Sequence, residues 1–160
     1  MIRIGQSVDI HQLTKGRRLI LGGIEIPFEK GLLGHSDADV LLHAIAESIL
    51  GALALGDLGR HFPDTDPKYA GMDSRKILSG VIAMMKERGY HIVNLDATVL
   101  AEKPKLKDYI DSMRSAVAEI AECEADQVSI KATRGEKLGF VGRQEGICAL
   151  CVCLLSDDAD

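Results

Sequence analysis

The chain has 160 residues, 46% of them hydrophobic, which suits a single globular domain spanning residues 1–160 with a sizeable core. Its net charge is −5 and its Lys and Arg residues are scattered, which disfavours nonspecific nucleic-acid or anionic-membrane binding. No apolar run approaches the roughly twenty residues of a membrane span, and the first residues lack a signal peptide's apolar stretch. We therefore expect a cytoplasmic protein without nucleic-acid or membrane partners, or an organellar one if the chain has been trimmed.

Apolar periodicity predicts alternating strands and helices. In the first half we expect a strand at 2–11, a short hairpin from 18–22 and 24–27, a helix at 37–55 and a Gly-, Asp- and Pro-rich loop at 56–71. The second half predicts a helix at 74–88, a strand at 91–101, a helix at 106–121 and strands at 128–133 and 146–155. This order indicates an α/β or α+β fold with one mixed sheet that carries helices on one face. The apolar terminal strands suggest that the other face is buried too, against other subunits.

Four cysteines, Cys123, Cys148, Cys151 and Cys153, raise the question of a zinc or disulfide site. Cys148 and Cys151 form a C-x-x-C pair, but residues three apart on a strand face opposite sides and cannot hold one ion. We expect all four to be reduced, structural residues.

A metal site is indicated near the end of the first strand. Asp9 and His11 are two apart, so in a strand they point to the same side, and His43 on the following helix is a candidate third ligand. An Asp/His/His set leaves one coordination position open, as in catalytic zinc sites. Taken alone, the same residues also fit a turn carboxylate beside a surface histidine, and a helix histidine held by its own hydrogen bonds.

His35 and Ser36 stand just before the predicted helix. Backbone donors and the helix dipole at that end favour an anion such as a phosphate, and Ser36-x-x-Asp39 resembles a capping box. Asp39 lies one turn before His43, so it could orient that imidazole or compete as a ligand; capping and orientation are the preferred reading.

Several short motifs follow one another in a fixed order over nearly the whole chain. They are Asp9-Ile10-His11, the run from Gly31 to Asp39 with His43, Gly56 to Gly59, Phe62 to Pro67, Pro104-Lys105, Glu136 to Phe140 and Gly142-Arg143. Together they resemble the 2-C-methyl-D-erythritol 2,4-cyclodiphosphate synthase family of the non-mevalonate isoprenoid pathway. The resemblance implies a homotrimer with active sites at subunit interfaces and sheets facing the centre, with an isoprenoid diphosphate as a candidate ligand of the central channel. It also implies that a cytidine diphosphate ester becomes a cyclic diphosphate with release of CMP.

The resemblance also implies roles for individual residues. Asp9, His11 and His43 hold zinc, and Glu136 binds a magnesium or manganese ion that bridges the substrate phosphates. Catalytic roles fall to His35 and Arg134. Substrate contacts near the zinc come from Asp9, Ile10, His11, His35 and Ser36. The wall for the ribose and methylerythritol hydroxyls comes from Asp57, Leu58, Gly59, Phe62, Pro63, Asp64, Thr65 and Asp66. The cytosine and diphosphate pocket comes from Ala101, Glu102, Lys103, Pro104, Lys105, Leu106, Lys107, Thr133, Arg134, Gly135 and Glu136. Beside it, Arg143 would contact a phosphate and Phe140 would form part of the wall.

Two of these assignments have a simpler structural alternative. The 57–66 segment also fits an acidic surface loop, and Arg143 also fits a solvent-exposed charge. Two positions depart from the family pattern. Ser7 stands where the family usually has glycine, and Arg134 stands where it has a threonine that helps to stabilise the transferring phosphate. The remaining functional alternatives are a zinc-dependent phosphohydrolase and a non-catalytic, metal-stabilised trimer that binds an isoprenoid diphosphate.

Overall fold

One five-stranded mixed sheet organises the computed structural model, which describes residues 1–158. Its strands are β1 (Ile2–Lys15), β4 (Lys30–Leu32), β5 (His91–Leu100), β6 (Val128–Thr133) and β7 (Gly146–Ser156), in the order β4-β1-β7-β5-β6. The β5–β6 pair is parallel and the other pairs are antiparallel. A separate hairpin consists of β2 (Leu19–Leu21) and β3 (Ile24–Ile26). The mixed α+β fold expected from the sequence is confirmed.

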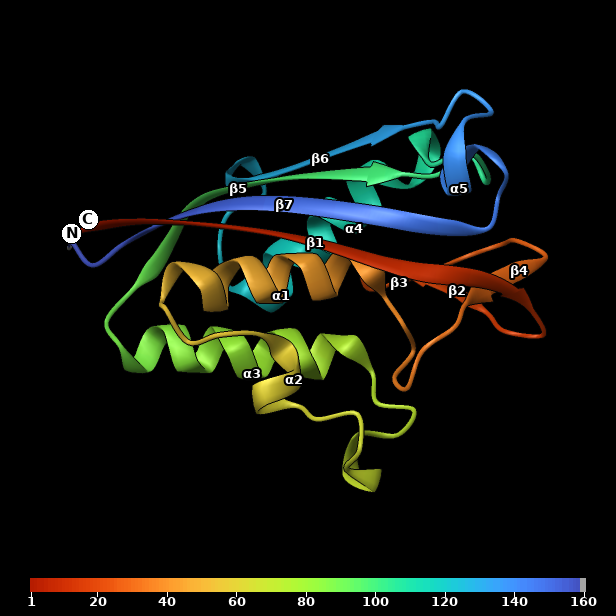
Figure 1. The fold of residues 1–160 in the computed structure, drawn as a ribbon. Helices are drawn as coiled ribbons and strands as arrows, with labels where there is room; N and C mark the ends of the chain where they lie inside the picture. Colours follow the sequence, from red (N-terminus) through yellow and green to blue (C-terminus); the bar gives the residue numbers. More distant parts are fainter. Residues whose placement is uncertain (159–160) are drawn as a thin grey trace.

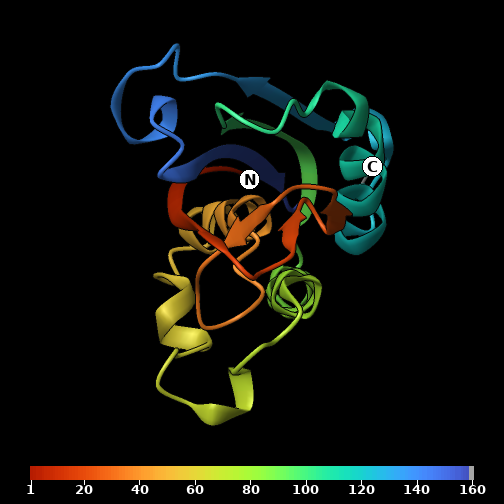
Figure 2. The same cartoon turned by 90° about the vertical axis from the view of Figure 1, so that its right-hand side faces the viewer.

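Three longer helices pack on one side of the sheet (Figure 1). They are α1 (Val40–Ala52), α3 (Ser74–Glu87) and α4 (Ile110–Ala121). Shorter turns are α2 (Leu58–His61), α5 (Gly139–Gly142), η1 (Pro67–Tyr69), η2 (Lys107–Tyr109) and η3 (Ala125–Gln127). Viewed end-on, the sheet curves around α1, and α3 lies beneath that helix (Figure 2). Helix α1 is therefore enclosed by protein, which explains its apolar sequence.

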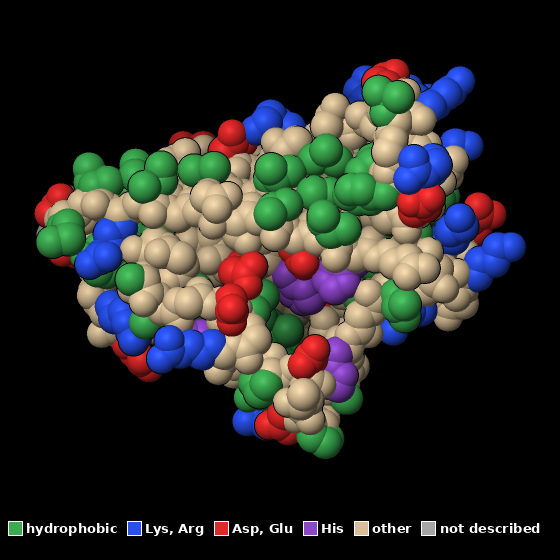
Figure 3. All heavy atoms as spheres, viewed as in Figure 1, with side chains coloured by type: hydrophobic (Ala, Val, Ile, Leu, Met, Phe, Trp, Pro, Cys, Tyr) green, Lys and Arg blue, Asp and Glu red, His purple; other side chains and the backbone are tan. Residues whose placement is uncertain are grey.

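The convex face of the sheet is apolar and exposed in the single chain. Side chains on alternate positions of β1 and β7 form this patch, which Figure 3 shows as hydrophobic atoms along the sheet. It consists of Ile4, Val8, Ile10, Leu150 and Val152. The apolar character expected for both faces is present, and no part of the described chain covers this one.

Several boundaries differ from the sequence prediction. Strand β1 continues past residue 11 to Lys15 because Leu13–Lys15 pair with β4. Helix α1 begins at Val40 rather than 37, since Ala38 has a left-handed backbone (φ 60°) and Asp39 is extended. The segment predicted as a loop at 56–71 contains α2 and η1, each of which follows an aspartate that accepts a backbone hydrogen bond. The helix predicted at 106–121 starts with the tighter turn η2.

The cysteines are all free, and those of β7 are buried. Cys151 and Cys153 face the helices, where Ser48 donates a hydrogen bond to the Cys151 sulfur at 3.4 Å. Burial raises the pKa of the Cys151 thiol to about 12. In the described residues, no helix combines the length and apolarity that a membrane crossing requires.

Helix α1 rests directly on the backbone of β1 at Gly5. A Cβ atom at Gly5 would lie 1.9 Å from the Ser48 carbonyl oxygen and 2.7 Å from the Ala52 amide nitrogen. Only glycine allows this approach, because the obstructing atoms are backbone and cannot rotate away. Gly5 therefore sets how closely the helix lies against the strand.

We expect Gly5→Ala to lower the free energy of unfolding by about 1–3 kcal/mol, because the helix must move away from the strand. Urea denaturation measures the change. Gly51→Ala is the matched control: the nearest atom to its added Cβ, the Gln6 carbonyl oxygen, lies 3.8 Å away. That substitution removes a helical glycine and should stabilise the protein by about 0.5–1 kcal/mol. Wild-type stability for Gly5→Ala would contradict the close-contact argument.

Candidate functional site

Three side chains converge where β1 passes α1. Asp9 Oδ2 lies 3.1 Å from His11 Nε2 and 3.2 Å from His43 Nδ1, and the two imidazole nitrogens lie 3.3 Å apart. The alternation of β1 turns Asp9 and His11 toward the helix, and α1 brings in His43. One potential ligand atom from each residue lies within 4.8 Å of the others. The predicted Asp/His/His cluster is therefore assembled, in a hollow that Figure 3 shows as purple histidines beside red carboxylates.

The outward nitrogens of both imidazoles are held by acceptors. His11 Nδ1 donates to the Leu33 carbonyl oxygen at 2.8 Å, which leaves Nε2 without a proton in the neutral ring. His43 Nε2 lies 2.9 Å from the Ser74 hydroxyl oxygen, whose own proton is donated to Asp37 Oδ1. Ser74 Oγ thus accepts from His43, and His43 Nδ1 keeps its lone pair. In these tautomers His11 and His43 each present an unprotonated nitrogen at the centre of the cluster, as metal ligation requires.

Without a metal, the charges within the cluster favour an ionised Asp9 beside a protonated His11. Burial alone would raise the pKa of the Asp9 carboxyl, but hydrogen bonds and charge from both imidazoles hold that pKa well below its usual range. For His11, burial acts to lower the pKa, and the hydrogen bond and charge of Asp9 outweigh it, so the pKa is raised. Because only the neutral imidazole is a ligand, protons compete with metal at His11 from a higher pH than at an ordinary histidine.

Asp39 is a structural carboxylate and not a metal ligand. It is fully buried, and its oxygens accept hydrogen bonds from the amides of Leu42 at 3.0 Å, Gly22 at 2.9 Å and Gly23 at 2.7 Å. Burial raises its pKa, and these three hydrogen bonds act against that rise. Asp39 therefore caps α1, as preferred in the sequence analysis, and also holds the β2–β3 turn. The ring of His43 is oriented by Ser74 instead.

The capping box predicted for Ser36-x-x-Asp39 is wrong. Ser36 Oγ accepts from the Ala38 amide at 3.1 Å within a turn, while the Leu42 amide in the first turn of α1 bonds to the Asp39 carboxylate. The side chain that caps α1 is therefore Asp39 and not Ser36. Ser36 Oγ lies 3.3 Å from His43 Nε2. Ser36 therefore contacts the metal cluster through the His43 ring.

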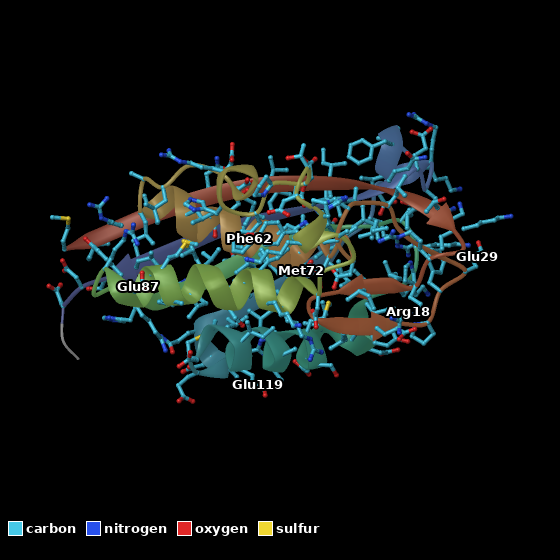
Figure 4. The ribbon with its side chains drawn as sticks, turned by 90° about the horizontal axis from the view of Figure 1, so that it is seen from below. Arg18, Glu29, Phe62, Met72, Glu87 and Glu119 are labelled. Carbon is cyan, nitrogen blue, oxygen red and sulfur yellow. The ribbon has the colours of Figure 1, made fainter. Side chains whose placement is uncertain are left out.

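A cavity of about 470 Å³ opens beside the cluster. Nine predicted site residues line it: Asp9, His11, His35, Ser36, His43, Leu58, Gly59, Phe62 and Asp64. Phe62 anchors its outer wall, since its ring lies alongside α3 (Figure 4) and meets the Tyr69 ring edge-on at 5.6 Å between centroids. The loop from 57 to 69 is thus a packed wall rather than a purely solvated acidic segment.

Other predicted residues near the metal stand back from this cavity. The Ile10 side chain is 53% exposed on the convex face, and only its amide serves the site, by donating to Asp9 Oδ1 at 2.9 Å. Asp57 and Asp66 use their carboxylates to cap α2 and η1. Pro63 and Thr65 do not line the cavity.

A second cavity, of about 490 Å³, lies where β5 and β6 end. Its lining includes the predicted Ala101, Glu102, Pro104, Lys105, Leu106, Lys107, Thr133, Arg134 and Glu136. Gly135 supports it by donating its amide to Glu102 Oε2 at 3.0 Å, which ties the two walls together. Lys103 does not line it. The two cavities share no lining residue within the described chain, so the predicted site occurs as two separate halves.

Phe140 and Arg143 lie apart from both halves. They line a third hollow, of about 620 Å³, together with Ile10 and Glu145. Arg143 Nε donates to Glu145 Oε1 at 2.8 Å, and the hydrogen bond and charge of that carboxylate raise the pKa of the guanidinium. Their predicted place beside the cytosine and diphosphate pocket is not reproduced within one chain.

Three residues at the metal end were not predicted from the sequence: Asp37, Glu47 and Ser74. Ser74 orients His43, and Asp37 orients Ser74 by accepting from both its hydroxyl and its amide. Glu47 lines the same cavity. A signal for Glu47 was available, because it is the next residue after His43 on the same stripe of an otherwise apolar helix.

Comparisons with known proteins agree on one group. A family model described as the YgbB family matches residues 2–156. A relative named 2-C-methyl-D-erythritol 2,4-cyclodiphosphate synthase, from Geobacillus kaustophilus, is 58% identical over 155 residues, which cover 97% of this chain and 98% of the relative.

Solved structures give the same result. The bifunctional IspDF of Campylobacter jejuni superimposes with a TM-score of 0.93 at 39% identity, covering 97% of this chain, which spans 42% of that longer protein. A CDP-bound form of 2C-methyl-D-erythritol-2,4-cyclodiphosphate synthase superimposes with a TM-score of 0.89 at 31% identity, covering 96% of this chain and 100% of that one.

We expect Asp9→Ala and His43→Ala to lose stoichiometric binding of a divalent metal, because each removes one of three converging potential ligand atoms. Elemental analysis after dialysis measures the metal content. His91→Ala is the matched control, since His91 pairs with Ser156 at the end of the sheet where Ile2 lies, far along β1 from Asp9. Full metal retention in both variants would contradict the site.

A graded variant tests the orientation of the imidazole. Ser74→Ala keeps all three candidate ligands but removes the nearer of the two hydroxyls at His43 Nε2, so metal affinity should fall by about 10-fold to 100-fold. Competition with a zinc chelator measures the affinity. An unchanged affinity would show that the His43 ring is held without the hydroxyl.

Proposed function

The chain belongs to the YgbB family, and we propose that it converts 4-diphosphocytidyl-2-C-methyl-D-erythritol 2-phosphate to 2-C-methyl-D-erythritol 2,4-cyclodiphosphate with release of CMP. In enzyme classification this is a phosphorus–oxygen lyase, and the reaction belongs to non-mevalonate isoprenoid biosynthesis. The observation that carries the proposal is the convergence of Asp9, His11 and His43 in a chain that is 58% identical over 97% of its length to a synthase of that name.

The reaction needs positioning more than covalent catalysis. An oxygen of the substrate's 2-phosphate attacks the β-phosphorus, a new P–O bond forms, and CMP departs with the electrons of the bond that breaks. No protein nucleophile takes part. Holding the two phosphates in line and stabilising their charge is therefore the main task of the site.

Residues of the metal half hold the reacting phosphates in this proposal. Asp9, His11 and His43 would bind zinc, which when bound supplies positive charge to polarise the attacked phosphate. His35 and Ser36 line the same cavity and offer hydrogen-bond donors to phosphate oxygens.

The second cavity would hold the cytidine and the diphosphate. Lys105 and Arg134 line it and bring positive charge to an anionic ligand. Glu136 lines it as well, and its carboxylate would bind a magnesium or manganese ion together with the substrate diphosphate. Magnesium commonly takes one or two carboxylates plus phosphate oxygens. The CDP-bound relative supports a cytidine nucleotide as the ligand class.

A homotrimer would join the two halves. Within one chain the metal cavity and the β5–β6 cavity are separate, whereas a site between neighbouring chains can combine one of each. The exposed apolar face of the sheet, formed by Ile4, Val8, Ile10, Leu150 and Val152, gives the subunits a surface to bury around a centre. An isoprenoid diphosphate would bind in a central channel at this face.

A cytoplasmic location would suit the pathway.

Incubation with the proposed substrate, zinc and magnesium tests the function. We expect CMP and the cyclic diphosphate in equal amounts, identified by phosphorus NMR. Inorganic phosphate without cyclisation would indicate a phosphohydrolase, and the absence of any product would indicate a binding protein; either outcome overturns the proposal.

We expect a mass of three times the chain mass of 17.3 kDa in light scattering. Val8→Asp should dissociate the assembly, because the patch would carry a charge on burial. Val8→Thr has nearly the same shape without a charge and should keep the trimer. A fully active monomer at low concentration would contradict the shared site.

We expect Arg134→Thr to raise kcat under saturating substrate and metal, by on the order of tenfold or more. A hydroxyl can donate one short hydrogen bond to the transferring phosphate, whereas the guanidinium pairs with ground-state phosphates and leaves the β-phosphorus less well placed. Arg134→Ala separates loss of the charge from gain of the hydroxyl. Equal or lower turnover for the threonine variant would show that arginine is suited to this pocket.

A further inference from the structure

Glu47 is a carboxylate at the metal cavity for which the proposed function has no use. It lies four residues after His43 on α1, so both side chains project from the same side of the helix. Glu47 lines the metal cavity with the two ligands of β1. Its surroundings show what it does in the fold.

Both oxygens of the Glu47 carboxylate are engaged. Oε2 accepts from the Ser7 hydroxyl at 2.9 Å, and Oε1 accepts from the Leu58 backbone amide at 3.1 Å. Ser7 is only 8% exposed, so water does not readily replace this partner. Hydrogen bonds to an ionised carboxylate are stronger than those between neutral groups, and two of them fix the position of the side chain.

Ser7 faces Glu47 across the gap between β1 and α1, as Asp9 faces His43. Ser7 precedes Asp9 by two residues on the same face of β1, and Glu47 follows His43 by one turn of α1. The strand and the helix are thus joined twice, by His43 with Asp9 at 3.2 Å and by Glu47 with Ser7 at 2.9 Å.

The bond to Leu58 extends this link to the opposite wall. Leu58 is the first residue of α2, and it lines the metal cavity together with Gly59. The amide of Leu58 belongs to the first turn of α2, where backbone donors have no partner within the helix. Glu47 supplies that partner and so ties the wall to the helix that carries His43.

We propose that Ser7 and Glu47 are positioning residues that hold the Asp57–Gly59 wall at a fixed distance from the metal ligands, for the substrate of the proposed function. The effect of this pair falls on substrate binding rather than on metal content.

Four variants test the assignment. Glu47→Ala removes both hydrogen bonds, Ser7→Ala removes one, and the double variant asks whether the two act as a pair. Glu47→Gln keeps an acceptor for Leu58 and a group that bonds to Ser7, so it serves as the conservative rescue. Each is measured by steady-state kinetics, zinc stoichiometry and hydrogen exchange of the Leu58 amide.

We expect Glu47→Ala to raise KM by about tenfold, to speed exchange of the Leu58 amide by a similar factor, and to retain one zinc per chain. Ser7→Ala should act in the same direction with a smaller effect, and should add nothing to Glu47→Ala. Glu47→Gln should recover most of the loss.

Two results would overturn the assignment. Unchanged Leu58 exchange in Glu47→Ala would show that the wall is held without the carboxylate. Loss of zinc in proportion to activity would place Glu47 in the metal site itself. The exchange and zinc measurements need no substrate, so wild-type protein that forms no CMP would refute the proposed function alone.

Discussion

The contact between helix α1 and the backbone of β1 at Gly5 governs the geometry of the metal end. Because Gly5 meets Ser48 and Ala52 without a side chain between them, the helix can approach no closer, and its height above the strand is fixed there. Moving along β1 toward Lys15, the gap first admits the Ser7 hydroxyl and then the Asp9 carboxylate with two imidazoles. The distance between the ligands of β1 and His43 of α1 is thus set by the contact at Gly5, four residues before Asp9.

Period-two and period-3.6 patterns predicted most of the fold and the ligand set, since they depend only on which residues share a face. Asp9 and His11 follow from the strand alternation, and the family follows from the ordered motifs. The same alternation turns the Ile10 side chain to the convex face, away from the Asp9 cluster, and leaves its backbone beside the cluster. Residue-by-residue transfer from a family motif cannot separate side-chain roles from backbone roles.

Long-range hydrogen bonds account for what the sequence did not reveal. Asp39 looked like a local cap, yet two of its three amide partners come from the β2–β3 turn. Ser74 reaches His43 from the start of α3, a helix whose position depends on packing rather than on a motif. Likewise the separation of the predicted site into two cavities follows from strand order, because β7 lies between β1 and β5.

The pairing of β1 with β7 also has a consequence for the order of events during translation. The three ligands lie within the first 43 residues, but the main partner of the strand that carries two of them is residues 146–156. Until that segment leaves the ribosome, β1 presents an unpaired edge and an apolar surface, the features that expose nascent chains to aggregation and chaperones. Contacts of such large sequence separation slow folding, so assembly of the ligand cluster waits until residues 146–156 have been made.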